Sequence, residues 1–355
     1  MSLRDRHLWE VTAAGLLLGA LGVLLSLWGN PENSGICVSC FLENAAGALG
    51  LHGNERMQYL RPELIGFVLG SAMTAVGFRE FRSRGGSAPV LRLFSGVFLI
   101  VGCSVFIGCP IKLFLRLTAG DLTAAAGVAG LVAGVWLGLK GFANGVELAD
   151  GPRERGGSGL WVPALFLLLG VFSVVRPAFL LSSEQGSAGQ HAGWSLSLGS
   201  GLVLGAVAQR SRFCITGSIR DTLLMGGRSY LFFGGVAFLA TSLGFNVGSG
   251  RFHPGLYGQP GAHTEHLWSF LGMVLVGWTS VLIGGCPFRQ LVKAGEGDAD
   301  AGLVVVGMLL GGALAQSWGI AATAAGVSLV GKVAVLLGFA FILLISLFLR
   351  ERSPG

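Results

Sequence analysis

The sequence predicts an all-α, polytopic membrane protein with about ten hydrophobic helices in two inverted repeats, broken or re-entrant at Gly-Cys-Pro. Hydrophobic residues make up 52% and charged residues 12% of the 355 residues, whereas soluble domains carry about a quarter charged residues. Several apolar runs are as long as a membrane-spanning helix requires. Motifs in the first half also recur in the second, which indicates an internal repeat.

Apolar segments separated by polar, Gly-rich or Pro-containing stretches are expected to form the helices. The first follows a polar start with Arg4 and Arg6 and has no small-residue cleavage site, so we expect it to be retained as a helix. Sixty glycines suit such a protein, because small residues let membrane helices approach closely. The segments are 11–28, 63–78, 93–108, 122–145, 161–181, 193–208, 230–247, 268–285, 301–317 and 323–349.

The most informative motif occurs twice. An apolar segment runs into Gly-Cys-Pro at Cys109 and again at Cys286, and we call the separation between these two cysteines, which is half the chain, the repeat length. In both copies a basic residue follows the Cys by three positions, a second basic residue follows four positions later, and Gly-Asp closes the stretch. Proline lacks the N–H that would continue a helix, so both segments are expected to break there. The basic residues are Lys112 and Arg116 in the first copy and Arg289 and Lys293 in the second.

A second motif recurs after the same repeat length. Cys37 and Cys214 occupy equivalent positions in similar stretches, and the Gly130/Gly134 pair is matched by Gly307/Gly311. We therefore divide the single membrane domain into a first repeat, residues 1–177, and a second repeat, residues 178–355. Five apolar segments in each half is an odd number, which predicts that the halves insert with opposite orientations.

Basic residues provide an independent test of this topology. With the N-terminus inside, sixteen Lys and Arg residues fall on the inner side and five on the outer side. This asymmetry is what the positive-inside rule expects. It predicts a bacterial-type inner membrane protein with both termini in the cytoplasm. The net charge of +6 thus needs no nucleic-acid partner; the bilayer is the expected surrounding.

Two broken helices that enter from opposite sides can meet near the middle of the bilayer and form a substrate site. Helix N-termini favour an anion, and thiols add soft, polarizable contacts. We expect Cys37, Cys109, Cys214 and Cys286 to line a substrate path, flanked by the charges of Lys112, Arg116, Arg289 and Lys293. Such a site suits a small sulfur- or selenium-containing anion. Asp121 and Asp298, which close the two copies, are expected to cap the following helices.

The remaining cysteines and histidines are weaker candidates. Cys103 corresponds to Ser280 and is expected to be a packing residue. Cys40 forms Cys-x-x-Cys with Cys37, which allows redox or metal chemistry, but its counterpart is Gly217, so a symmetric path does not need it. The Pro/Gly-rich loop with His253, His263 and His266 is interpreted as a solvated loop. No metal and no cofactor is expected.

At these motifs the chain resembles the YeeE/YedE family of sulfur-transport membrane proteins. The stretches 35–42, 58–63 and 116–121 are most similar to the YedE branch, which is linked with selenium transport. The resemblance implies transport of a selenium compound or a thiosulfate-like ion along an hourglass-shaped path by S–H···S contacts without covalent capture. Carried over by motif, it places Cys109 and Cys286 near the constriction, with Cys37 and Cys214 beside them. It also implies a separate, cytoplasmic TusA-like sulfur-carrier protein as a partner.

Two other classes remain open from the sequence. One is a membrane thiol–disulfide oxidoreductase that cycles Cys37–Cys40 or Cys109–Cys286, although no quinone or thioredoxin-like module is evident. The other is a membrane scaffold for a TusA-like carrier, which would dock on the basic stretches 79–92 and 210–228. Transport, and no enzymatic activity, is the interpretation we favour.

Overall fold

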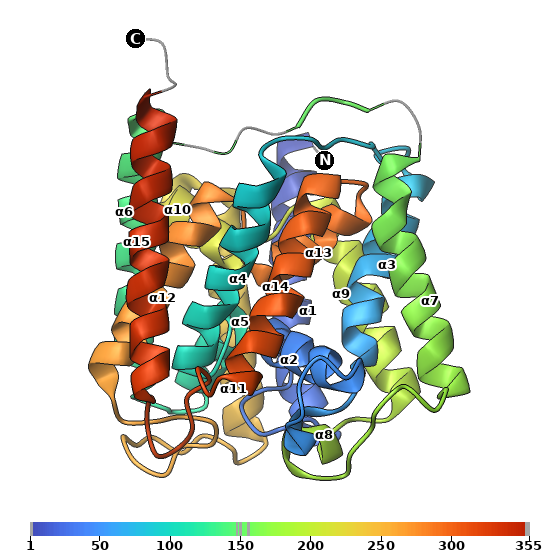
Figure 1. Cartoon of the computed structure of the whole chain (residues 1–355), viewed down its shortest axis with the longest axis vertical. Coiled ribbons are helices and arrows are strands. Elements are labelled where there is room, and N and C mark those ends of the chain that lie inside the picture. The colour runs from blue at the N-terminus through green and yellow to red at the C-terminus, as the bar shows by residue number, and fades with distance from the viewer. Residues whose placement is uncertain (1–2, 147, 149–150, 155–156, 352–355) are drawn as a thin grey trace.

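In the computed structural model, which describes residues 3–146, 148, 151–154 and 157–351, the chain folds into a bundle of helices (Figure 1). Within this described part there is no β-strand, so the all-α prediction is confirmed there. Arg155 and Arg352, two of the basic residues counted on the inner side, lie outside the described residues. The side chains of Arg4 and Arg350 do as well.

The two halves contain the same series of helices. The long helices of the first half are α1 (Leu3–Leu27), α3 (Pro62–Gly77), α4 (Pro89–Phe106), α6 (Ala124–Ala143) and α7 (Trp161–Val175). Those of the second half are α9 (Trp194–Ser211), α11 (Tyr230–Gly248), α12 (His266–Leu282), α14 (Ala299–Ser317) and α15 (Leu329–Glu351). Four short helices follow the cysteine motifs: α2 (Val38–Ala48), α5 (Pro110–Thr118), α10 (Ile215–Met225) and α13 (Pro287–Gly295). The connections contain α8 (Gly186–Gly189), η1 (Glu55–Met57), η2 (Ser158–Leu160) and η3 (Gly226–Arg228).

Eight of the described helices are long and apolar enough to cross a membrane. This number is smaller than the ten predicted segments, because α3 has only 16 residues and α9 is interrupted by serines and ends in Gln-Arg-Ser. Two of the eight candidates join a long helix to the short helix after it, over Pro89–Thr118 and His266–Gly295. The multi-pass membrane character therefore stands, and the count of ten remains a prediction.

The helices keep the spacing of the sequence motifs. The first residues of α2, α4 and α5 are each followed, one repeat length later, by the first residues of α10, α12 and α13. The closest helix pairs follow the repeat as well, because replacing each helix of a pair by its counterpart in the other half gives another close pair. α1 packs on α11 and α9 on α3, while α6 packs on α12 and α14 on α4. The two halves are thus interlocked, each of these long helices of one half lying against a helix of the other.

Glycines make these pairs possible. A Cβ atom on Gly130 would collide with the carbonyl oxygen of Phe270, and one on Gly307 would collide with that of Leu93. Phe270 and Leu93 are themselves one repeat length apart, so one close approach of two backbones is used twice. The predicted glycine faces therefore serve packing within the chain, as small residues do between membrane helices.

The last helix of each half departs from this pattern. α7 packs on α3, α13 and α14, whereas α15 packs on α4 and α12. In Figure 1, α7 runs down the view and α15 runs up, and α1 begins at the same end at which α15 finishes. Opposite directions are what an inverted repeat requires. The inverted repeat itself, and the side of the membrane on which each end lies, remain predictions.

Candidate functional site

Each of the four motif cysteines lies at the start of a short helix. Cys37, Cys109, Cys214 and Cys286 are the N-cap residues of α2, α5, α10 and α13. Pro110 and Pro287 occupy the first position of α5 and α13, where a missing N–H costs nothing. Gly-Cys-Pro thus ends one helix and starts another, and the thiol is placed in the break.

The second-half cysteines form a close pair. The sulfur of Cys214 lies 3.4 Å from the sulfur of Cys286, and it also accepts from the backbone N–H of Cys286 at 3.5 Å. The hydroxyl of Thr216 lies 3.2 Å from the Cys214 sulfur. Both thiols are buried in the described structure. Two motifs that are 72 residues apart in the chain therefore meet at one point.

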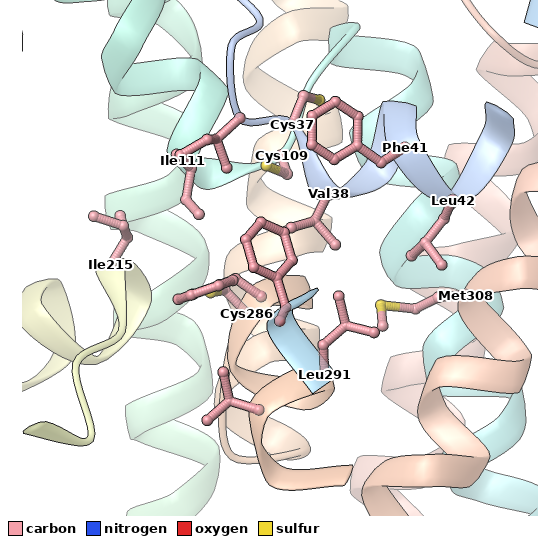
Figure 2. Packing of buried hydrophobic residues seen from close by; sticks show 14 of the residues in the cluster. Cys37, Val38, Phe41, Leu42, Cys109, Ile111, Ile215, Cys286, Leu291 and Met308 are labelled. Carbon is pink, nitrogen blue, oxygen red and sulfur yellow. The ribbon is translucent and has the colours of Figure 1, made fainter. Parts of the chain in front are cut away.

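The first-half cysteines are arranged in the same way. Cys109 lies beside Cys37, and both thiols are buried (Figure 2). The Cys37 sulfur accepts from the backbone N–H of Cys40 at 3.4 Å and lies 3.4 Å from the Ser39 hydroxyl. In Figure 2, Cys286 lies below Cys37 and Cys109 in the view. The predicted path residues are thus brought together as two thiol pairs.

Two cavities lead toward these pairs. One, of about 740 Å³, is lined by Cys40, Glu43 and Lys112, and we name it the Lys112 cavity. The other, of about 360 Å³, is lined by Cys214, Arg212 and Arg289, and we name it the Cys214 cavity. The Lys112 cavity includes Ser187 of α8, at the lower end of Figure 1, and the Cys214 cavity includes His7, near the start of α1 at the upper end.

The two cavities are equivalent under the repeat. Lys112 and Gly108 of the first correspond to Arg289 and Gly285 of the second, and Glu43 corresponds to Arg220. Cys37, Cys109 and Cys286 are nearly inaccessible and line neither cavity. The buried thiols therefore separate two hollows that open at opposite ends of the bundle.

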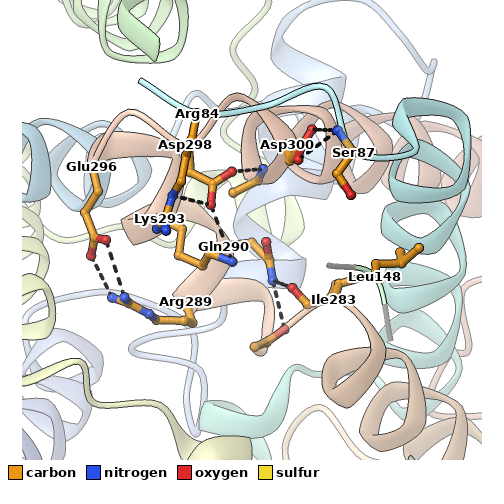
Figure 3. Close-up of polar contacts among 12 residues, drawn as sticks. Arg84, Ser87, Leu148, Ile283, Arg289, Gln290, Lys293, Glu296, Asp298 and Asp300 are labelled. Atoms are coloured by element: carbon orange, nitrogen blue, oxygen red, sulfur yellow. Dashed lines mark hydrogen bonds and ion pairs between the residues drawn. The ribbon is translucent and has the colours of Figure 1, made fainter. Parts of the chain in front are cut away.

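The second basic residue of each motif is neutralised by the Asp that closes it. The guanidinium of Arg116 donates to the carboxylate of Asp121 at 2.7 Å, and both side chains are almost fully buried. Lys293 lies 3.5 Å from Asp298, which also pairs with Arg84 at 3.3 Å (Figure 3). The basic residue and the Gly-Asp sequence recur together because the ion pair between them holds the end of the short helix in place. We call this ion pair the clamp.

The expected capping role applies to only one of these aspartates. Asp298 caps α14, since its carboxylate accepts from the N–H of Ala301 at 2.9 Å. In the first half the cap residue of α6 is Thr123, and Asp121 accepts from the Thr123 backbone N–H just before the helix. For Asp121 the prediction was wrong, because α6 begins only after Thr123; one carboxylate oxygen of Asp121 accepts from Thr123 and the other from Arg116.

The first basic residue of each motif lines a cavity, but the two differ in their partners. Arg289 pairs with Glu296 at 2.9 Å (Figure 3). Lys112 is 3% exposed, its ammonium lies 3.9 Å from the sulfur of Cys40, and among the residues described it forms no ion pair. Glu296 corresponds to Ala119 in the first half, which explains why Lys112 lacks the equivalent acid.

Glu43 is the residue that our sequence analysis missed. It lies in α2, one turn after Cys40, and its carboxylate lines the Lys112 cavity. Ser104 of α4 donates to one carboxylate oxygen at 2.6 Å, and Gln316 of α14 donates to the other at 2.6 Å. The available signal was a lone acid within an apolar stretch, because charges in membrane segments are often functional.

The other candidates fall outside the thiol pairs. Cys103 is buried in the core of α4. Cys40 lines the Lys112 cavity and is the only cysteine described as partly exposed. The ring of His263 contacts the carbonyl oxygen of Val105 and accepts from the Glu265 N–H, so it holds its loop against α4. No group of three or more possible metal ligands is found in the described part of the chain.

Residues 210–350 match the model of a family described as sulphur transport. No curated protein matches the chain. The matched region contains Cys214, Cys286 and every lining residue of the Cys214 cavity except His7. A transport family agrees with a multi-pass helical bundle whose buried thiols lie between two cavities. Over this part of its second half, the chain is thus similar to a family of sulphur-transport proteins.

Proposed function

We propose that this protein imports a small sulfur- or selenium-containing anion by passing it along four buried thiols. The ion enters the Lys112 cavity, contacts Cys37 and Cys109, then Cys286 and Cys214, and leaves through the Cys214 cavity. The observation that carries this proposal is the position of the two thiol pairs between two cavities that open at opposite ends. Multiple weak contacts suit transport, because a site that binds too tightly does not release.

The charges support an anionic cargo. Lys112 brings an ammonium without a described carboxylate partner to the first cavity, and Arg212 and Arg228 line the second. Helix N-termini at the four cysteines add backbone N–H groups that favour negative charge. Thiols are soft and polarizable. They therefore favour a sulfur or selenium atom over a hard oxyanion of equal charge. Selenium compounds and thiosulfate are the cargoes we put forward.

The direction of transport and the partner belong to the same proposal. With both termini in the cytoplasm of a bacterial-type inner membrane, the Lys112 cavity faces outward and the Cys214 cavity faces the cytoplasm. A soluble TusA-like carrier would then receive the cargo beside the exposed Arg212 and Arg228. Consumption of the cargo inside the cell would keep the flux inward.

Uptake into proteoliposomes tests the proposal. Labelled thiosulfate, selenite and selenide are offered to wild type, Cys109→Ala and Cys286→Ala, with Cys103→Ala as the matched control because its thiol is buried outside the path. One species that wild type and the control accumulate, and that both path variants fail to accumulate, would support transport. Flat traces for every species with folded wild-type protein would overturn it.

A thiol–disulfide activity is the second candidate, because the sulfurs of Cys214 and Cys286 lie only 3.4 Å apart. Under that alternative, mass spectrometry of the isolated protein finds a Cys214–Cys286 disulfide that a dithiol reductant removes, and turnover requires both oxidised and reduced forms. Under transport, uptake is supported by the fully reduced protein alone. Uptake assays in the presence and absence of reductant separate the two.

A further inference from the structure

Glu43 is a buried carboxylate held only by neutral groups. Its side chain accepts from the Ser104 hydroxyl and from the Gln316 amide, and Glu43 is 5% exposed. No lysine, arginine or histidine of the described chain lies at ion-pair distance from it. A carboxylate removed from water is costly to keep charged without a cation partner, and protonation is the usual relief.

The nearest cation with no described acid partner of its own is Lys112. It belongs to α5, lines the same cavity as Glu43, and contacts the sulfur of Cys40, one turn before Glu43 on α2. The lining of this cavity holds two acids, Glu43 and the exposed Glu32, and two cations, Lys112 and Arg56. When an anion binds at Lys112, the ammonium is neutralised by the cargo and the buried Glu43 becomes an uncompensated negative charge.

We propose that Glu43 takes up a proton from solvent when the anion binds in the Lys112 cavity, so that anion binding is linked to proton binding. The inference rests on the proposed transport function and adds a pH dependence to its capture step. A like charge nearby disfavours the ionised form of a carboxylate. Coupling between two binding events is reciprocal, so protonation of Glu43 must strengthen anion binding by the same factor by which the anion strengthens proton binding.

Among the titratable groups around Glu43, we expect Glu43 to be the one that takes up the proton. Arg61, at the start of α3, is held by Asn44 and Asn30, and the ring of His52 contacts the backbone carbonyl of Glu43. From α13 and α14, Arg289, Lys293 and Asp300 are held in ion pairs of their own. The remaining titratable groups around the cavity are Cys37, Cys40, Cys103, Lys112, Arg56 and the exposed Glu32.

The second half has no equivalent acid. Arg220 stands at the position of Glu43 and pairs with Asp221 at 2.8 Å, and Arg289 pairs with Glu296. An anion that reaches the Cys214 cavity therefore meets an arginine, and not a carboxylate, at the position of Glu43, and Asp221, which also lines this cavity, is paired with Arg220. The proposed proton uptake at Glu43 thus belongs to the Lys112 cavity.

Calorimetric titration of the detergent-solubilised full chain with thiosulfate tests the coupling. Measuring the heat in buffers of different ionisation enthalpy counts the protons bound with each anion, and thiosulfate itself carries no titrating group between pH 6 and 8. We expect wild type to bind up to one proton, and its affinity to fall by up to about tenfold per pH unit as the pH rises. Glu43→Gln should bind no proton and lose this pH dependence, while Glu32→Gln, the exposed cavity acid, should behave as wild type.

The outcomes separate this inference from the function on which it rests. Cys109-dependent uptake with no proton bound by wild type, or with the same proton count in Glu43→Gln as in wild type, would overturn the coupling alone. The absence of Cys109-dependent uptake for every anion offered would overturn the transport function. The wild-type proton count decides the question even if Glu43→Gln does not fold, and Glu43→Asp should restore proton binding.

Discussion

The two halves of the chain place the same motif in different electrostatic surroundings. In the second half, Arg289 is balanced by Glu296. In the first half, the equivalent Lys112 has no described carboxylate partner and contacts the sulfur of Cys40. What both halves share is structural: the Cys-capped short helix and the ion pair to the closing Asp.

Comparing the two halves shows which repeated positions have a structural role and which have changed. Residues that clamp the broken helices match across the halves, whereas the residues that face a cavity have diverged. Arg289 is balanced by Glu296 whereas Lys112 has no described acid, so we expect Lys112 to contribute more to anion capture than Arg289 does. This local asymmetry changes how tightly each end binds an anion, and the gradient of the cargo sets the direction of net flux.

The largest effect is expected from the shared clamp. Asp121→Ala leaves Arg116 buried without its acid, and breaking such a pair costs about 3–5 kcal/mol of folding stability. Asp298→Ala should cost less, because Lys293 and Arg84 are both partly accessible to water. Thermal unfolding of the two variants in detergent checks this. Equal losses would show that the clamps do not differ as their burial indicates.

Next in size is the loss of the unbalanced cation. Lys112→Met should lower uptake at low substrate concentration by about ten- to a hundredfold, because a hydrogen bond to a charged group is worth ~1.5–3 kcal/mol. The matched variant in the other half removes both partners, Arg289→Met with Glu296→Gln, so that no charge is left alone. This double variant should lose clearly less uptake than Lys112→Met does. A larger loss in the double variant would reverse the assignment of capture and release.

A smaller effect is expected from a substitution that makes the second half resemble the first. Glu296→Gln leaves the buried Arg289 without its acid, and the Cys214 cavity should then hold an anion about two- to tenfold more tightly, because a new hydrogen bond from the guanidinium contributes ~0.5–1.5 kcal/mol. Efflux of labelled thiosulfate from preloaded vesicles should slow by that factor. Faster efflux would contradict the idea that Glu296 tunes release.

The smallest effect is expected at Cys40. Its counterpart Gly217 has no side chain, so the symmetric path works without a thiol there, and Cys40→Ser should change the uptake rate by less than about twofold. Cys37→Ala, one turn away, should abolish uptake. A strong loss in Cys40→Ser would move Cys40 into the path and would favour redox use of the Cys-x-x-Cys motif.

Much of the scaffold could be predicted from local chemistry. Gly-Cys-Pro breaks a helix wherever it occurs, and Gly130/Gly134 with Gly307/Gly311 indicated close helix packing before any partner was known. The partners themselves could not be predicted, because they are set by tertiary contacts. Glu43 meets Gln316 across 273 residues of chain. Arg116 and Lys293 were predicted as cargo charges, and the structure pairs each with an Asp that the sequence suggested only as a cap.

The exchange of helix partners has a consequence for how the protein is made. α1 lies against α11 and α3 against α9, so the glycine faces of α3 and α1 stay uncovered until the second half has been synthesised as far as α9 and α11, respectively. The two halves therefore cannot fold one at a time, as separate domains do. A chain that stopped before Tyr230 would therefore leave α1 without its partner helix.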